Sequence, residues 1–249
     1  MNLDAVYILW LREIKRFMRS KSRIIGSLAF PSLILIIIGT GLNSVFTMGT
    51  LSYSEFLAPG MIGMVLLFSS ISFGIMIIWD RQFGFLKEIL VAPISRTSII
   101  LGKALGGVTT SMVQALLFLV VCFALGIKFP SPFKLALLLT VMVLIAVGFV
   151  LLGIALSSRM KDFHGFSLIM NLVVMPVFFL SGAFFPLDRL PGWLKWLVYV
   201  DPLTYGVDAL RFCMVNTSTF PIGISLFALI VFGAVATVVG TLLFSTSQL

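Results

Sequence analysis

Charge is what this sequence has least of. Of its 249 residues only 17 are Lys or Arg and 9 are Asp or Glu, whereas 60% are hydrophobic. The mean hydropathy is +1.17. Soluble domains carry roughly 25% charged residues, so this composition excludes a soluble globular domain. We expect residues 1–249 to form one integral membrane domain surrounded by the lipid bilayer.

Cysteine, histidine and the common catalytic motifs are also scarce or missing. Cys122 and Cys213 have no CxxC spacing, and His164 is the single histidine. The sequence contains no GxxxxGK[ST], HExxH or GxSxG motif. Disulfide frameworks, metal sites and nucleotide-phosphate sites therefore lack the residues they need. We expect no catalytic residue, no metal and no cofactor on this chain, and two buried apolar cysteines.

Long uncharged runs are the main feature that is present. Each is long enough to cross a bilayer as a helix, and they lie at residues 24–42, 56–79, 104–127, 135–158, 163–186 and 220–244. The predicted fold class is therefore all-α integral membrane, with six transmembrane helices. The span centres hold no Asp, Glu, Lys or Arg, whereas proton- or sodium-coupled carriers usually need such a group. Gly102 and Gly106 form a small-xxx-small pair, a spacing too common to carry weight.

Residues 1–23 have a different, amphipathic pattern. One helical face would present the apolar side chains of Leu3, Val6, Tyr7, Trp10, Ile14 and Phe17. The opposite face would present Arg12, Arg16 and Arg19. This pattern is typical of a helix that lies on an anionic membrane surface and does not cross it.

The basic residues indicate the orientation. Twelve of the 17 Lys and Arg fall in residues 1–23, 80–103 and 157–162, which six crossings would place on one side. Because the Lys/Arg-rich side faces the cytoplasm, we expect a multi-pass protein of the prokaryotic cytoplasmic membrane with both termini cytoplasmic. The basic residues gather at membrane edges and not on a soluble fold, so we expect no nucleic-acid partner.

Between the fifth and sixth runs, residues 187–215 are apolar but interrupted by prolines and charges. We expect two short helices, residues 191–200 and 202–215, folded as an outer re-entrant hairpin, with Asp201 capping the second. A sharper reading makes the region a gate formed by Pro186, Pro191, Asp201, Pro202, Tyr205, Asp208 and Arg211. The simplest reading of Asp208 and Arg211 is a local ion pair. Phe178 and Phe179 either line a substrate path or pack helices together.

The cytoplasmic segment 80–103 also contains apolar residues at helical spacing. Phe85 and Leu86 alternate with charged groups in this segment, and Pro93 ends the pattern. A short amphipathic helix here is either a connector at the membrane surface or an element that docks on a partner. Spacing alone favours the connector.

The two segments together resemble a known family. In the cytoplasmic segment the matching residues are Gly84-Phe85-Leu86, Ala92-Pro93-Ile94-Ser95-Arg96 and Gly102-Lys103. In the outer segment they are Leu180-Ser181-Gly182, Phe185-Pro186-Leu187, Leu190-Pro191 and Asp201-Pro202-Leu203-Thr204-Tyr205 through Arg211. In this order they resemble the permease subunits of type-2 ATP-binding-cassette (ABC) exporters, particularly daunorubicin-resistance-like drug and lipid exporters.

The resemblance implies more than composition does. It implies that the chain pairs with a second copy of itself or a homologous permease, and with separate ABC ATP-binding subunits that hold ATP and Mg. It places a coupling helix at residues 81–91, with a lesser contact at residues 157–163. The implied coupling residues are Arg81, Gly84, Phe85, Leu86, Lys87, Glu88, Arg159 and Asp162. The chain departs from the family pattern in this segment. Many relatives have Arg-Glu where this chain has Arg81-Gln82, and Gly-Thr where it has Gly84-Phe85, so the resemblance does not indicate which ATPase the chain accepts.

We therefore expect a non-catalytic permease that exports an amphiphilic or apolar drug, lipid or glycolipid-like substrate, driven by ATP hydrolysis on a partner. The alternative is a passive channel or secondary carrier without an ATPase. An integral membrane enzyme is a third reading, but the sequence offers no constellation of reactive groups for it.

Overall fold

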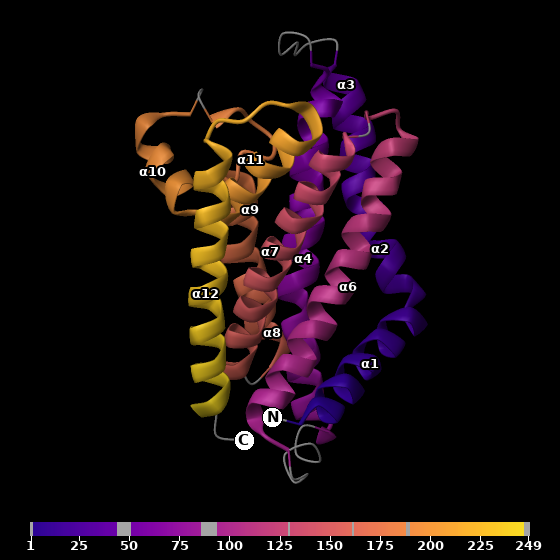
Figure 1. Cartoon of the computed structure of the whole chain (residues 1–249), viewed down its shortest axis with the longest axis vertical. Coiled ribbons are helices and arrows are strands. Elements are labelled where there is room, and N and C mark those ends of the chain that lie inside the picture. Colours follow the sequence, from indigo (N-terminus) through magenta and orange to yellow (C-terminus); the bar gives the residue numbers. More distant parts are fainter. Residues whose placement is uncertain are drawn as a thin grey trace.

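The computed structural model describes residues 2–43, 51–85, 94–128, 130–160, 162–187 and 190–246, with side chains through residue 243. Within these ranges the chain forms helices and no strand (Figure 1). In chain order they are α1 (Leu3–Arg19), α2 (Lys21–Ile34), η1 (Leu35–Gly39), α3 (Thr40–Leu42), α4 (Tyr53–Gln82), α6 (Arg96–Ala124), α7 (Pro132–Arg159), α8 (Phe163–Ile169), η2 (Met170–Val174), α9 (Met175–Leu180), α10 (Gly192–Val200), α11 (Pro202–Val215) and α12 (Ile222–Thr246).

Six helical stretches of the described chain are long and apolar enough to cross a membrane, which confirms the predicted all-α integral membrane fold. They are Lys21–Leu42, Tyr53–Gln82, Arg96–Ala124, Pro132–Arg159, Phe163–Leu180 and Ile222–Leu243. The fifth ends earlier than the predicted residue 186. It stops because Gly182 takes a left-handed conformation (φ 73°), which turns the chain away from the helix axis.

Helix α4 is the centre of the bundle. It packs against α6, α7 and α11, and most residues of its apolar stretch are buried. The backbones of α4 and α7 touch at Gly74 and Gly153, where a Cβ on Gly74 would clash with the Gly153 carbonyl oxygen. Small residues permit this close approach between membrane helices. Helices α2 and α12 lie at the periphery of the bundle, on opposite sides (Figure 1).

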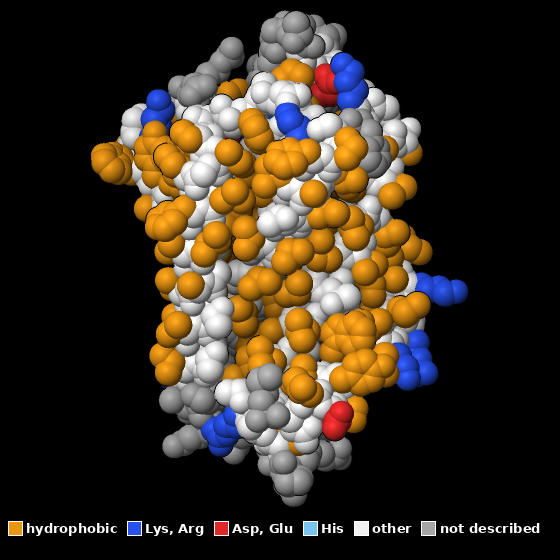
Figure 2. All heavy atoms as spheres, viewed as in Figure 1, with side chains coloured by type: hydrophobic (Ala, Val, Ile, Leu, Met, Phe, Trp, Pro, Cys, Tyr) orange, Lys and Arg blue, Asp and Glu red, His pale blue; other side chains and the backbone are white. Residues whose placement is uncertain are grey.

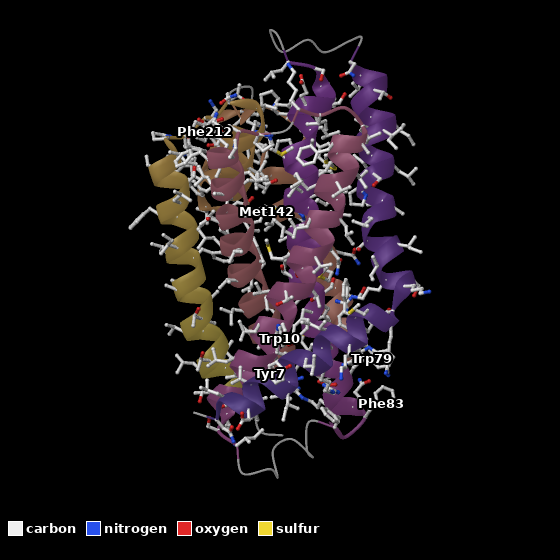
Figure 3. The ribbon with its side chains drawn as sticks, turned by 45° about the vertical axis from the view of Figure 1, so that its right-hand side comes forward. Tyr7, Trp10, Trp79, Phe83, Met142 and Phe212 are labelled. Atoms are coloured by element: carbon white, nitrogen blue, oxygen red, sulfur yellow. The ribbon has the colours of Figure 1, made fainter. Side chains whose placement is uncertain are left out.

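The surface of the bundle suits a bilayer. On the face in Figure 2, hydrophobic side chains cover the middle, and charged ones gather at the two ends and at the edge where α1 meets α2. Tyr7, Trp10, Trp79 and Phe83 lie together near one end, and Phe212 lies near the other (Figure 3). Aromatic residues are enriched at both membrane–water interfaces. The chain is therefore a multi-pass membrane protein.

Helix α1 forms where the amphipathic pattern predicts it, but the face that it buries shares only Phe17 with the predicted apolar face. Asn2 caps it, with Oδ1 accepting the Asp4 and Ala5 N–H groups. The buried residues are Ala5, Leu9, Glu13 and Phe17, which follow one another at four-residue spacing. Leu3 and Tyr7, expected on the apolar face, are 68% and 57% exposed. The helix buries this other face because it packs against α6.

The Gly102 and Gly106 pair, which the sequence left without weight, forms the seat for α1. A Cβ on Gly102 would lie 2.8 Å from Leu9 Cβ, and one on Gly106 would lie 2.7 Å from Glu13 Cβ. The indole Nε1 of Trp10 on α1 donates to Thr109 Oγ1 on α6 at 3.1 Å. Bare backbone on α6 thus lets α1 come close enough to bring its charged side chains over the end of α4.

Candidate functional site

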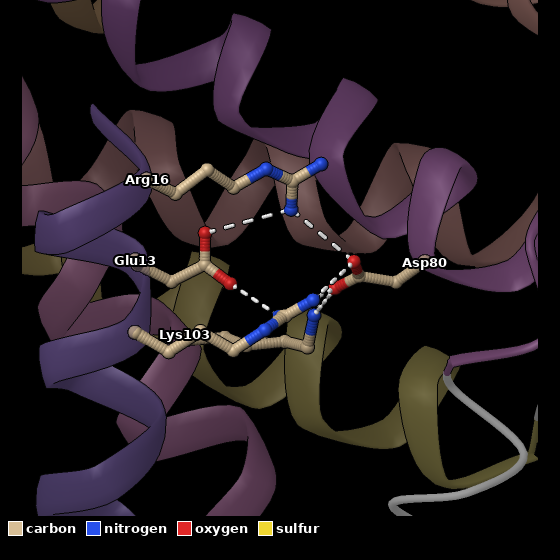
Figure 4. A network of polar contacts seen from close by, with 5 residues as sticks. Glu13, Arg16, Asp80 and Lys103 are labelled. Carbon is tan, nitrogen blue, oxygen red and sulfur yellow. Dashed lines mark hydrogen bonds and ion pairs between the residues drawn. The ribbon is translucent and has the colours of Figure 1, made fainter. Parts of the chain in front are cut away.

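A buried carboxylate lies at the end of α4 that faces α1. Asp80 is 3% exposed and accepts hydrogen bonds from three cations (Figure 4). Its Oδ1 lies 3.0 Å from Arg12 Nη2 and 3.2 Å from Arg16 Nη1, and its Oδ2 contacts Lys103 Nζ. The partners come from α1 and α6, so one carboxylate joins three helices that are far apart in the sequence.

A second carboxylate completes this ion-pair network. Glu13 is also 3% exposed, and its Oε1 accepts from Arg12 Nη1 at 2.9 Å, while Arg16 Nη1 lies 3.9 Å from Oε2. Lys103 is 1% exposed, so it has almost no access to water. A buried charge without a partner is strongly destabilising. The network of Arg12, Glu13, Arg16, Asp80 and Lys103 therefore holds α1, α4 and α6 in one arrangement.

The network lies on both flanks of the predicted coupling segment. Asp80 precedes that segment on α4, Lys103 follows it on α6, and Arg12 reaches it directly. The Arg12 guanidinium lies over the Phe85 ring, with Cζ 3.6 Å from the ring centre. Contacts therefore join this segment to α1 and, through the network, to the two helices that flank it, α4 and α6.

The predicted coupling residues lie in several environments. Gly84 has a positive φ of 78°, which ends the helical run before it. Helix α4 runs through Gln82, so Arg81 belongs to this membrane helix and not to a separate coupling helix beginning at residue 81. Helix α4 extends this far because no proline or glycine lies between Gly74 and Gly84, and the rest of the predicted coupling helix stays a prediction. Leu86, Lys87 and Glu88 lie outside the described residues.

Arg81 joins the two segments that the sequence predicts to be cytoplasmic. Its Nη1 donates to the Met160 carbonyl at 2.9 Å, and its Nη2 donates to the Ser158 carbonyl at 3.0 Å. These carbonyls end α7, where backbone acceptors lack helical partners. In the same turn Arg159 is exposed. Asp162 caps α8 by accepting the Gly165 N–H at 2.7 Å. The end of α4 and the α7–α8 turn therefore form one surface.

At the opposite end of the bundle, the two helices of the predicted hairpin form close to their expected bounds. Helix α11 starts at Pro202 with Asp201 as N-cap, whose Oδ1 accepts the Leu203 N–H at 2.9 Å. Asp201 lies in the turn between α10 and α11, and burial raises its pKa to about 7. Pro191 precedes α10, and Pro186 is half-buried in the turn before it. The Tyr205 hydroxyl donates to the Tyr199 carbonyl and so ties α11 to α10.

The predicted ion pair between Asp208 and Arg211 is not formed. The Asp208 carboxylate accepts the Thr219 and Phe220 N–H groups at 2.6 and 3.1 Å, which anchors the chain before α12. Arg211 Nη2 donates to the Gly182 carbonyl at 2.8 Å, and the guanidinium lies over the Phe56 ring at 4.0 Å. Burial lowers the pKa of Arg211 to about 10. The two charges thus anchor separate loops at this end of the bundle.

The two phenylalanines predicted for a substrate path differ in exposure. Phe178 is 1% exposed, and its ring packs edge-on against Phe68 and Phe184. Phe179 is 52% exposed and stacks on Phe184. Phe178 has the environment of a packing residue, while a path along Phe179 stays a prediction.

No motif or spacing in the sequence marks Asp80, Lys103 and Glu13 as one site. Asp80 and Lys103 are charges at the edges of apolar runs, and Glu13 lies inside the amphipathic segment 1–23. The available signal was that charges are rare near membrane depth and usually pair with one another. Their mutual contact depends on α1 folding back onto α6, which residue spacing does not reveal.

The comparisons with known proteins agree on one kind of protein. Residues 4–215 match the family model described as ABC-2 type transporter. A protein of Porphyra purpurea named as a transport permease, ycf38, is 31% identical over 175 residues, which are 70% of this chain and 60% of that protein. The inner membrane transport permease YadH of Escherichia coli (strain K12) is 27% identical over 234 residues, 92% of this chain and 90% of that protein. Nodulation protein J of Rhizobium leguminosarum bv. trifolii is 28% identical over 208 residues, 82% of this chain and 76% of that protein.

Proposed function

Because the chain belongs to the ABC-2 type transporter family and is thus a membrane permease of an ABC transporter, we propose that it exports its substrate using ATP hydrolysed on a separate subunit. The observation that carries this proposal is the ion-pair network around Asp80. It holds α1, α4 and α6 together around the segment that would dock on the ATPase.

The network explains how a push on a small segment would reach the bundle. Lys103 and Asp80 are both almost fully buried, so separating them leaves an uncompensated charge. The three helices should therefore move as one body when the ATP-binding subunits close. Rigid-body movements of this kind are a common route by which transporters change the side to which a site opens.

The ATP-binding partner would touch the surface formed by Phe85, the end of α4 and the α7–α8 turn. Arg81 ties this turn to α4, so contact at either segment acts on the same helices. A second permease subunit, either another copy of this chain or a homologue, would complete the transporter. The network end of the bundle would lie in the cytoplasm, with both termini, and the α10–α11 hairpin would face outward.

The substrate we propose is amphiphilic or apolar, of the drug, lipid or glycolipid-like class. Export of such molecules is supported by the apolar interior of the bundle and by the family's exporters that the sequence resembles. No described residue group of this chain has the make-up of a metal site, and ATP and Mg would be held by the partner.

The test is transport by the complex purified from its native membranes and reconstituted in vesicles. Added ATP should drive uptake of a fluorescent amphiphile into inside-out vesicles, and the complex should hydrolyse ATP. Phe85→Asp should reduce both rates about tenfold or more, because a new carboxylate facing Arg12 and the partner disturbs their contact. The matched control is Phe133→Asp at the other end of the bundle, where Phe133 is 82% exposed.

Transport by the purified chain alone, without ATP or a second protein, would establish the passive or secondary carrier instead. Equal losses in Phe85→Asp and Phe133→Asp would show that the segment has no special role in coupling.

A further inference from the structure

A groove lies between α2, α4, α6 and the start of α9, and none of the five network residues lines it. Its volume is about 440 Å³, within the range of small-molecule sites. The lining is mostly apolar, but a basic and an amide side chain are part of it. The coupling surface and the outer hairpin contribute no lining residue, so this groove is a separate feature.

One end of the groove carries an unpaired cation. Arg23 lies in the first turn of α2 and is half-buried, and no described residue forms an ion pair or hydrogen bond with its side chain. Basic side chains gather on the side of the molecule where α1 meets α2 (Figure 2), and clustered cations of this kind attract anionic lipid headgroups. A guanidinium in this place is suited to an anionic headgroup, which it binds through paired hydrogen bonds.

Deeper in the groove lies an amide without a partner. Gln114 of α6 is 1% exposed, and its Nε2 has no hydrogen-bond partner among the described residues. Buried polar groups are nearly always hydrogen-bonded, because an unpaired one is costly. Because Gln114 lines the groove, its unpaired amide N–H groups are available to a molecule bound there.

The remaining walls suit a hydrocarbon chain. Phe30, Met64, Phe68 and Met175 line them. Phe30 lies seven residues beyond Arg23 on the same helix, which is a rise of about 10 Å. Gly26 lies between them, and a Cβ there would meet no atom within 4 Å, so its bare backbone leaves the groove open.

We propose that this groove binds one anionic amphiphile taken from the bilayer. Its acidic headgroup would contact Arg23, a carbonyl oxygen of the amphiphile would accept a hydrogen bond from Gln114 Nε2, and its hydrocarbon chain would pack against Phe30 and Phe68. The proposal rests on the proposed function, because it makes the groove the place where the exporter collects its substrate. It narrows the substrate class from amphiphiles in general to those with a negative headgroup.

The test measures binding without the ATPase. The purified chain in neutral detergent is titrated with phosphatidylglycerol, and separately with phosphatidylcholine of the same chains, and bound lipid is counted by native mass spectrometry. We expect phosphatidylglycerol to bind about tenfold more tightly, as one charge-assisted contact allows. Arg23→Ala should remove the preference, while Lys21→Ala, an exposed cation in the same helical turn that does not line the groove, should keep it.

Two further variants separate binding from folding. Gly26→Leu should fill the groove and abolish binding of both lipids, whereas Gly41→Leu, also with open space around its Cβ but outside the groove, should not. Gln114→Leu should weaken binding of both lipids without lowering the unfolding temperature, since the lost amide has no partner to leave behind. Inorganic phosphate alone should not compete, because it has no chain.

The proposal is overturned if Arg23→Ala and Gly26→Leu bind both lipids as the unchanged chain does. It is also overturned if Gly26→Leu changes the oligomeric state and not lipid binding, because a second subunit would then cover the groove. Selective binding by a chain that shows no ATP-driven transport would retain the site and reject the exporter.

Discussion

At the scale of single residues, the carboxylate of Asp80 is the group on which most charged contacts depend. We expect Asp80→Asn to lower the free energy of unfolding by roughly 3–5 kcal/mol, because it leaves the Lys103 ammonium buried without an anion. The double variant Asp80→Asn with Lys103→Met should recover a large part of this loss, since no unpaired charge remains. Thermal unfolding in detergent measures both.

The matched comparison is with Arg16→Gln, which removes a cation that is 33% exposed in the same network. Water can replace part of its contact, so the loss should be smaller, about 1 kcal/mol or less. If Asp80→Asn and Arg16→Gln were equally mild, the network would not hold the helices together.

Asp201 gives a pH dependence with a defined sign. Its folded pKa is raised to about 7 by burial, against about 3.9 in an unfolded chain. The folded state therefore binds this proton more tightly, so its stabilisation is complete below about pH 4 and is lost as the pH rises through 7. We expect Asp201→Asn to flatten stability between pH 5 and 8 relative to the unchanged chain, measured by unfolding temperature. A parallel pH profile in the two proteins would contradict this.

The role of a residue could be predicted from the sequence where its partner is a close neighbour in the chain, but not where the partner is distant. Asp201 and Pro202 are adjacent, and capping of a proline-started helix depends on these neighbours alone, so the start of α11 was predicted. Arg211 binds the Gly182 carbonyl, 29 positions away, and spacing on one helix cannot reveal such a partner. The nearest opposite charge, Asp208, was therefore the wrong choice.

At the scale of elements, the seat of α1 on α6 decides where the charges of α1 go. We expect Gly106→Leu to push α1 away, because an added Cβ already lies 2.7 Å from Glu13 Cβ. Overpacking of this kind costs roughly 1–3 kcal/mol, and the displaced Arg12 would also lose Asp80. The matched control is Gly233→Leu on α12, where an added Cβ meets nothing within 4 Å. The unfolding temperature and the rate of ATP-driven transport should both fall in Gly106→Leu and stay unchanged in Gly233→Leu.

The buried face of α1 was not predictable from hydrophobicity. In a membrane protein an apolar face can contact either lipid or another helix, so a stripe of Leu3, Val6 and Tyr7 does not identify the packed side. What marked the contact was small size on α6, where Gly102 faces Leu9 and Gly106 faces Glu13 of α1. The existence of α1 followed from its amphipathic pattern, and its partner followed only from the three-dimensional arrangement.

At the scale of the whole molecule, the span count follows from the hydropathy of the chain, whereas orientation follows from charge alone. Helix α1 and the end of α12 lie at one end of the bundle and the α10–α11 hairpin at the other (Figure 1). The ion-pair network and its surrounding cations lie at the α1 end. The positive-inside rule therefore predicts that this end faces the cytoplasm.

Single cysteines placed at the two ends test this orientation. Cys122 and Cys213 are buried, and replacing both with Ala gives a background that a reagent does not label. On it, Gly192→Cys at the start of α10 and Arg159→Cys at the end of α7 are each exposed. A membrane-impermeant maleimide added to intact cells should label Gly192→Cys and leave Arg159→Cys unlabelled until the cells are opened. The reverse pattern would place the proposed ATPase surface outside the cell, where no ATP is supplied, and the coupling proposal would then be lost along with the orientation.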